Sequence, residues 1–213
     1  IFDLYNTLYP SSSGIFDEID KKMKVYISKK LNLSLADSFK LQKTLYKKYG
    51  TTLFGLMKFH GVEPVDFLDF VHDINLDGLK KSNELRFSID SLPGEKYIYT
   101  NGDEKWAEKI LNALGIEQSI NKIFDIIKSG YIPKPQKENY SKFVKEFNVD
   151  PKKSVFFEDT KKNLEYAHTI GMITIHIDEK FDFKNDDSNL ESFIDFKFKC
   201  IKSALKVINH HVK

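Results

Sequence analysis

Apolar and polar positions follow two different rhythms along this chain. In its first third, apolar residues recur three and four positions apart, the spacing that places side chains on one face of a helix. The clearest stretch comprises Phe16, Ile19, Met23, Tyr26, Ile27 and Leu31. Further helices are predicted over residues 34–48, 52–60 and 64–71. Because no strand pattern interrupts them, this part of the sequence predicts a small helical module.

Beyond Leu92-Pro93-Gly94, short β-rich runs alternate with helical stretches. The strands are predicted at residues 97–100, 123–127, 154–158 and 173–177, after a first buried strand that ends within residues 1–9. The helices are predicted at residues 104–114, 135–147 and 161–170. This alternation is typical of an α/β fold with a parallel sheet and helices on both faces. Residues 182–189 are expected to form an exposed loop.

Composition narrows the class of protein. A chain of 213 residues with 41% hydrophobic residues suits one α/β domain with an insertion, and it can bury a substantial core. A net charge of +2 argues against nucleic-acid binding by phosphate neutralisation. The single cysteine, Cys200, excludes an internal disulfide and a cysteine-based metal site. No apolar run reaches the roughly 18–20 residues of a membrane span. We therefore expect a cytoplasmic protein, whose oligomeric state the sequence does not indicate.

Polar residues follow the predicted strands at four places. These clusters are Asp3-Leu4-Tyr5-Asn6-Thr7, Thr100-Asn101-Gly102, Lys134-Pro135 and Glu158-Asp159. Taken singly, each is more typical of a turn or a helix cap than of a catalytic group. In a parallel sheet, however, the carboxyl ends of the strands meet at one edge, where ligands bind. Their occurrence after successive strands therefore indicates one shared site.

The chemistry that suits these residues is phosphoryl transfer to a carboxylate. Asp3 can act as a nucleophile and form an aspartyl-phosphate. Thr100 can hold phosphoryl oxygens, and Lys134 supplies positive charge beside them. Together with Asp3, Glu158 and Asp159 offer hard oxygen donors of the kind that bind Mg²⁺.

These motifs resemble those of the haloacid dehalogenase (HAD) superfamily, and the similarity covers essentially the whole chain. FDLYNTL is similar to its first motif, YTNG to its second, the lysine of PKP to its third and FFEDTKKNL to its fourth. The resemblance implies a Rossmann-like core at residues 1–10 and 88–213. It also implies a helical cap at residues 11–87, with hinges near residues 10–14 and 82–88. Longer stretches, including LPGEKYIYTNG and YKKYGTTLFGLMKFHGV, are similar to predicted pyrimidine 5′-nucleotidases.

Roles for individual residues follow from the resemblance. Asp3 matches the nucleophile, and Thr100, followed by Asn101 and Gly102, matches the phosphate-binding motif. Lys134 matches the conserved lysine, which also lies beside the phosphate. The metal would be held by Asp3, Glu158, Asp159 and the backbone carbonyl of Tyr5, while Asn163 matches a position that often supports the fourth motif. The expected protein is a Mg²⁺-dependent hydrolase of a small phosphorylated metabolite such as a nucleoside monophosphate.

Tyr5 departs from the phosphatase pattern. Phosphatases of the superfamily carry a second aspartate there, which protonates the leaving oxygen and then activates water. A tyrosine is a poor base at neutral pH, so we expect reduced activity. Tyrosine at this position also occurs in 2-haloacid dehalogenases, which is the alternative enzyme. Those enzymes use a cap arginine, but the only arginine here is Arg86, and they lack the acidic pair Glu158-Asp159.

A third alternative is a catalytically impaired HAD module that acts by binding a ligand or partner. Only Ile1 and Phe2 precede Asp3, where a central strand normally has four or five residues. Either further residues precede Ile1 or the middle of the sheet is weakened. Two aromatic residues remain without a defined role. Trp106 is expected to pack or to line the cleft between cap and core, and His72 to lie in or beside the cap.

Overall fold

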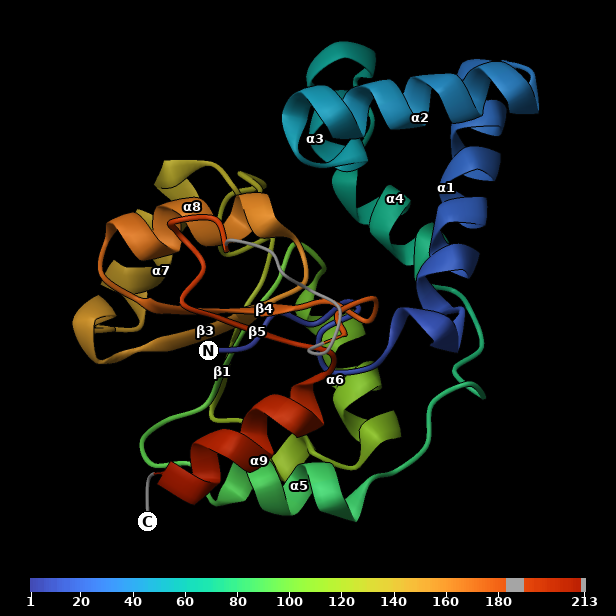
Figure 1. Ribbon diagram of the computed structural model, residues 1–213. Helices are drawn as coiled ribbons and strands as arrows, with labels where there is room; N and C mark the ends of the chain where they lie inside the picture. The colour runs from blue at the N-terminus through green and yellow to red at the C-terminus, as the bar shows by residue number, and fades with distance from the viewer. Residues whose placement is uncertain (183–189, 212–213) are drawn as a thin grey trace.

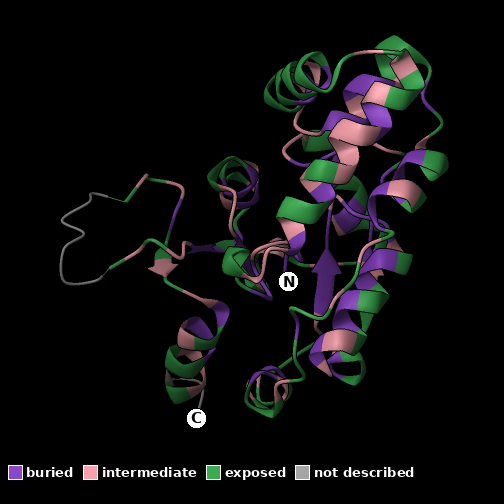
Figure 2. Ribbon diagram, turned by 90° about the vertical axis from the view of Figure 1, so that its right-hand side faces the viewer, coloured by how far each residue is buried: buried purple, intermediate pink, exposed green. Residues whose placement is uncertain are grey.

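A computed structural model describes residues 1–182 and 190–211. Apart from Asp182, the loop predicted at residues 182–189 lies outside this part of the chain. Four helices, α1 (Ile15–Leu31), α2 (Leu35–Tyr49), α3 (Thr52–His60) and α4 (Pro64–Val71), follow a 3-10 turn at Ser11–Ser13. They pack on one another at one end of the molecule (Figure 1), and Figure 2 shows a buried and an exposed side on them. The predicted helices of this region are confirmed.

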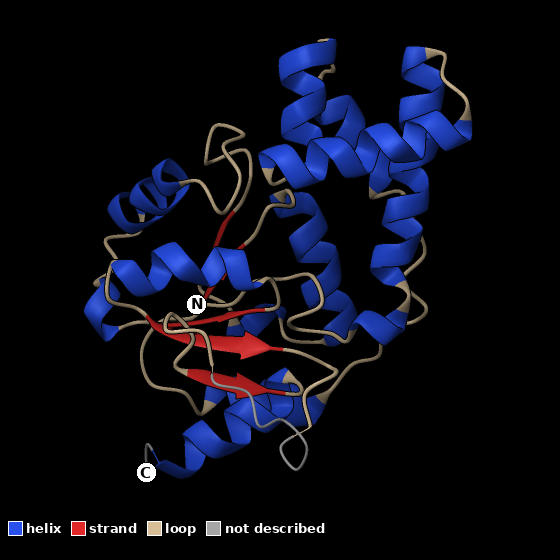
Figure 3. Ribbon diagram, turned by 45° about the horizontal axis from the view of Figure 1, so that its top comes forward, coloured by secondary structure: helices blue, strands red, loops and turns tan. Residues whose placement is uncertain are grey.

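The remainder alternates between strands and helices, as predicted. The strands are β1 (Tyr97–Tyr99), β2 (Lys122–Phe124), β3 (Val155–Glu158), β4 (Ile173–Ile177) and β5 (Phe196–Phe198). The helices are α5 (Asn83–Asp90), α6 (Glu104–Leu114), α7 (Lys137–Glu146), α8 (Lys161–Thr169) and α9 (Ile201–His211), with 3-10 turns at Glu117–Ser119 and Pro151–Lys153. In Figures 1 and 3, α7 and α8 lie on one side of the sheet, and α5 and α9 lie on the other. The expected α/β fold with a parallel sheet is therefore confirmed.

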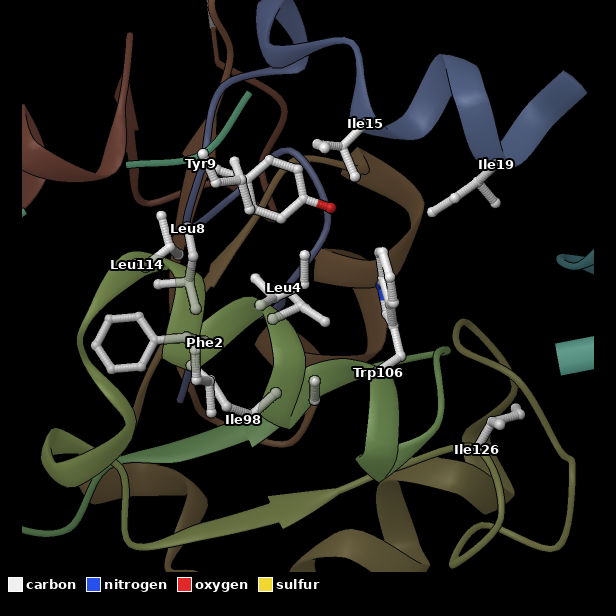
Figure 4. Packing of buried hydrophobic residues seen from close by; sticks show 14 of the residues in the cluster. Phe2, Leu4, Leu8, Tyr9, Ile15, Ile19, Ile98, Trp106, Leu114 and Ile126 are labelled. Atoms are coloured by element: carbon white, nitrogen blue, oxygen red, sulfur yellow. The ribbon is translucent and has the colours of Figure 1, made fainter. Parts of the chain in front are cut away.

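Residues 1–3 join the two halves of this sheet. β1 pairs with β2, and β3 pairs with β4 and β4 with β5, all in parallel. Phe2 forms parallel bridges to both Ile98 of β1 and Phe157 of β3. The N–H of Asp3 donates to the Phe157 carbonyl at 2.9 Å, which places Asp3 at the centre of the carboxyl edge. Phe2, Leu4, Ile98 and Trp106 belong to one apolar cluster beneath this edge (Figure 4).

Two predictions need correction. The strand predicted at residues 123–127 ends at Phe124, because the Asp125 carboxylate accepts hydrogen bonds from the N–H groups of Glu104 and Lys128 and closes a turn. The hinge expected at residues 82–88 is largely helical. Most of it belongs to α5, which packs on α9 and is joined to it by a hydrogen bond from Asn209 to the Ser88 carbonyl. The second crossing between the four helices and the sheet is therefore the preceding segment, residues 72–82.

Since α5 spans the predicted border at residues 87 and 88, the division into a core (1–10, 88–213) and a cap (11–87) stays a prediction. Within the part of the chain that the structure describes, no helix is long and apolar enough to cross a membrane.

Candidate active site

Asp3 is nearly enclosed at the sheet edge, with 4% of its surface exposed. One carboxylate oxygen, Oδ2, accepts a hydrogen bond from the Thr7 hydroxyl at 3.1 Å. The other, Oδ1, accepts from the Lys134 ammonium group at 2.8 Å. The loop after Asp3 turns back on itself because Asn6 adopts a left-handed conformation with φ 53°. This turn brings Thr7 over the carboxylate of Asp3.

Lys134 lies at the centre of the cluster and is 1% exposed. Its three ammonium donors meet three acceptors: Asp3 at 2.8 Å, Glu158 Oε2 at 2.7 Å and the Tyr99 carbonyl at 2.8 Å. The rings of Tyr99 and Phe156 have their centres 4.9 and 5.2 Å from Nζ. A buried ammonium requires this degree of pairing, since burial without partners would favour its neutral form. Lys134 therefore stays charged and holds the Asp3 carboxylate in place.

Three carboxylates share this one cation. Ligand atoms of Asp3, Glu158 and Asp159 all lie within 4.8 Å of one another. Burial raises the pKa of Asp3 to about 7, Glu158 adds to this rise and Lys134 opposes it. Burial likewise raises the pKa of Glu158 to about 7 and that of Asp159 to about 6. The cluster thus has excess negative charge and an all-oxygen donor set, which fits a hard divalent cation such as Mg²⁺.

Thr100, Asn101 and Gly102 lie beside this cluster and bind the protein itself. The Thr100 hydroxyl, fully buried, accepts from the N–H of Gly102 at 3.0 Å. Asn101 clamps the Lys134 backbone from both sides, because its Oδ1 accepts from the Lys134 N–H at 2.8 Å and its Nδ2 donates to the Lys134 carbonyl at 3.2 Å. Their predicted contact with phosphate stays a prediction, as do the roles of the acidic residues.

The structure directs the Tyr5 side chain toward the end of α4. Its hydroxyl lies 2.9 Å from His72 Nε2. Burial raises the pKa of Tyr5 well above 10, and Tyr9 and the acidic groups Asp103 and Asp3 add to this rise. A phenol in this environment keeps its proton, which agrees with the expectation that Tyr5 is a poor base. The sequence predicted that His72 lies in or beside the cap, but it did not predict its contact with Tyr5, because these two residues are far apart in the chain.

A cavity of about 960 Å³ separates the four helices from the sheet edge. Its lining includes apolar and aromatic side chains of the helices, among them Phe16, Met23, Tyr46 and Phe67, and polar groups of the site, among them Asp3, Glu158, Asp159 and Asn163. Asn163 is buried, and its carbonyl accepts from the Tyr140 hydroxyl at 2.6 Å, which ties α8 to α7. The sheet edge provides a charged floor for a reacting group. The helices provide a roof of apolar and aromatic side chains that also carries Lys43, Lys47, Lys48 and Lys58.

Comparison with known proteins places this geometry in context. A model of the hydrolase family described as haloacid dehalogenase-like hydrolase matches residues 1–171. An L-2-haloacid dehalogenase from Xanthobacter autotrophicus is similar in structure, with TM-score 0.59, 13% identity, and 97% of this chain and 96% of that chain covered. A HAD phosphatase from Thermococcus onnurineus has TM-score 0.61, 16% identity, and coverage of 97% and 95%. The HAD-hydrolase YfnB from Bacillus subtilis, bound to magnesium, has TM-score 0.61, 15% identity, and coverage of 98% and 96%.

Proposed function

Because the chain belongs to the haloacid dehalogenase-like hydrolases, we propose that it is a Mg²⁺-dependent phosphomonoester hydrolase. The observation that carries this proposal is the buried ion-paired cluster, in which Lys134 joins Asp3 and Glu158 next to Asp159. Asp3, Asp159, Glu158 and the Tyr5 carbonyl would hold the cation, which supplies charge neutralisation at the phosphoryl oxygens. The similar protein YfnB is bound to magnesium in its crystal structure, which is consistent with this choice of metal.

In the proposed reaction, an Asp3 carboxylate oxygen attacks phosphorus, and the bond between phosphorus and the leaving oxygen breaks. The resulting aspartyl-phosphate is hydrolysed by water, which restores the carboxylate and releases phosphate. Lys134 holds Asp3 in position during both steps and offsets negative charge. Tyr5 occupies the position at which phosphatases of the superfamily have the aspartate that serves as proton donor and base. Since such a group contributes roughly 100- to 10,000-fold, we propose that turnover is slow.

We propose a pyrimidine nucleoside monophosphate as the substrate class. The resemblance of LPGEKYIYTNG and YKKYGTTLFGLMKFHGV to pyrimidine 5′-nucleotidases suggests it, and a cavity of about 960 Å³ is large enough for such a molecule. The phosphate would lie on the polar floor, and the base would lie against the aromatic side chains of the roof.

A dehalogenase is the second candidate, favoured by Tyr5 and by structural neighbours such as the Xanthobacter enzyme. In that reaction Asp3 would attack carbon and displace halide. Two observations weigh against it. Without a metal to neutralise it, the acidic pair Glu158 and Asp159 would repel the carboxylate of a haloacid and the halide. The only arginine, Arg86, lies on α5 and does not line the cavity.

The test is to measure phosphate release from p-nitrophenyl phosphate and from nucleoside monophosphates, with Mg²⁺ or with a chelator. Halide release from 2-chloropropionate is measured on the same preparations. We expect Mg²⁺-dependent phosphate release that Asp3→Asn and Asp159→Asn abolish, while the exposed Asp90→Asn leaves it unchanged. Halide release without metal would instead support the dehalogenase. Absence of both activities in folded wild-type protein would favour a module that acts by binding.

A further inference from the structure

Four side chains from three segments meet where the four helices rejoin the sheet. The Tyr5 hydroxyl lies 2.9 Å from His72 Nε2, and His72 Nδ1 lies 2.9 Å from Asp103 Oδ1. The His72 ring stacks on Trp106 with 4.6 Å between ring centres and 8° between planes. His72, Asp103 and Trp106 are 6%, 7% and 1% exposed, so the contact excludes most water. We call these four residues the clasp.

The chemistry of the clasp determines where its protons lie. An ionised carboxylate only accepts hydrogen bonds, so Asp103 favours the His72 tautomer with its hydrogen on Nδ1. The angle at this hydrogen is poor for a hydrogen bond, so the contact is mainly electrostatic. In that tautomer Nε2 is an acceptor, and the Tyr5 hydroxyl must donate to it. The single proton of Tyr5 is thereby directed to α4 and away from a substrate on Asp3.

The location of the clasp gives this bond a mechanical consequence. His72 is the first residue after α4, where segment 72–82 begins, and Tyr5 lies two residues after Asp3. Gly102 packs directly against the Tyr5 hydroxyl, since a Cβ at this position would collide with it. An ion pair between Lys105 and Asp69 also joins α6 to α4 at 2.8 Å, but both side chains are more than half exposed, so it adds little.

We propose that His72, held by Asp103 and Trp106, is a positioning residue that fixes Tyr5 and thereby docks α4 on the loop of the nucleophile. Tyr5 takes part as a docking group rather than as the proton donor. The effect on turnover rests on the proposed phosphatase function, whereas the docking itself does not. In a phosphatase, loss of the clasp weakens substrate retention under the four helices and leaves the chemical step largely unchanged.

Trp106 is the only tryptophan, so its fluorescence reports on the clasp directly. The experiment measures acrylamide quenching of Trp106 in wild type, Tyr5→Phe, His72→Phe and the double variant, after circular dichroism has confirmed folding. His72→Phe keeps a ring on Trp106 and removes both nitrogens. His60→Phe, at the exposed end of α3, is the matched control. We expect acrylamide to quench Trp106 more strongly in the three clasp variants than in wild type, and to the same extent in the control as in wild type. Asp103→Asn, which preserves size, replaces His72→Phe if the latter does not fold.

Steady-state kinetics on p-nitrophenyl phosphate with Mg²⁺ complete the test. Loss of one such hydrogen bond should raise KM by roughly 3- to 10-fold in each single variant, with kcat changed less than about threefold. The double variant should lose no more than His72→Phe alone, because His72→Phe already removes the bond to Tyr5. A fall in kcat of roughly 100-fold in Tyr5→Phe would instead identify Tyr5 as the proton donor and overturn the proposal.

Unchanged quenching in all clasp variants, or additive effects in the double variant, would also overturn the clasp. If wild type releases no phosphate while the quenching pattern is as expected, the clasp is supported and the proposed function is contradicted.

Discussion

At the scale of single residues, the buried ammonium of Lys134 controls the geometry of the site. Its partners Asp3 and Glu158 are each nearly inaccessible. Removing one member of such a buried arrangement leaves an uncompensated charge, which is far more costly than losing a surface ion pair. We therefore expect Lys134 also to stabilise the folded protein when no metal is bound.

We expect Lys134→Met to lower the free energy of unfolding by about 3–5 kcal/mol when a chelator is present. The measurement is urea denaturation followed by circular dichroism. Lys145→Met on the exposed face of α7 is the control and should change this free energy by less than about 0.5 kcal/mol. Equal effects of the two substitutions would show that Lys134 does not hold the acidic cluster together.

Tyr5 provides the second prediction at this scale. If the site is a phosphatase that lacks only its acid and base, Tyr5→Asp should raise kcat for phosphate release by about 100-fold or more. Tyr5→Asn is the matched control, because it has the same shape as aspartate and cannot exchange a proton. Phosphate release by both variants is measured with Mg²⁺ present. A gain shared by Tyr5→Asn would mean that removing the phenol, and not supplying a carboxylate, accelerates the reaction.

Most of the site could be predicted from the sequence because its members are tied to strand ends. Asp3, Lys134, Glu158 and Asp159 each follow a strand or lie in a motif, and the structure brings them together. His72 could not be predicted in the same way. It meets Tyr5 only because α4 ends above the loop that follows Asp3, and a contact between residues 67 positions apart leaves no local pattern.

At the scale of elements, the turn between α2 and α3 packs against the loop that contains Lys134 and Pro135. Gly50 lies there with φ 87°, and a Cβ on it would be 3.1 Å from the Lys134 carbonyl and 3.2 Å from Pro135 Cδ. Glycine is needed both for its left-handed backbone and for this close approach. Gly50 and Pro135 both line the cavity, so this contact forms part of its wall.

We expect Gly50→Ala to lower kcat/KM for phosphate release, because the added methyl pushes the turn off the Lys134 loop. Gly61→Ala separates this effect from backbone strain. Gly61 also has a left-handed backbone, φ 59°, but a Cβ there would meet nothing within 4 Å. Gly61→Ala should cost about 1 kcal/mol of stability and leave the kinetics unchanged. Gly50→Ala should cost more, because φ 87° with ψ −34° lies outside the αL region, and it should also affect the kinetics. Equal kinetics in the two variants would contradict the role of the turn in the cavity wall.

Elements with strong end signals were predictable, whereas elements defined by distant partners were not. α2 begins after Ser34, whose hydroxyl accepts from the Asp37 N–H at 3.1 Å, and it ends before Gly50. By contrast, β5 has three residues and exists only as a neighbour of β4, and α5 is stabilised by its packing on α9. Short segments of this kind carry too little periodicity to be recognised before their partners are known.

At the scale of the whole molecule, the four helices enclose an acidic cluster over the sheet edge. The fold gathers the carboxylate of Asp3 and those at the end of β3, and these groups line the cavity under the four helices. Without a bound cation, repulsion between these carboxylates lowers the stability of the folded protein. The protein should therefore respond to pH and to Mg²⁺ in a linked manner.

The last prediction concerns this linkage. Burial raises the pKa of Asp3 and Glu158 to about 7, above the value of roughly 4 in an unfolded chain. The folded state therefore binds these protons more tightly, and its stability falls as pH rises from roughly 4 through about 7. With a chelator, the thermal midpoint should decrease between about pH 5 and pH 7.5. Saturating Mg²⁺ binds the deprotonated carboxylates, so it should remove this decrease and add about 2.7 kcal/mol at 100 times its Kd. Calorimetry on wild type and Asp159→Asn tests this, and an identical pH dependence with and without Mg²⁺ in wild type would contradict the proposed metal site.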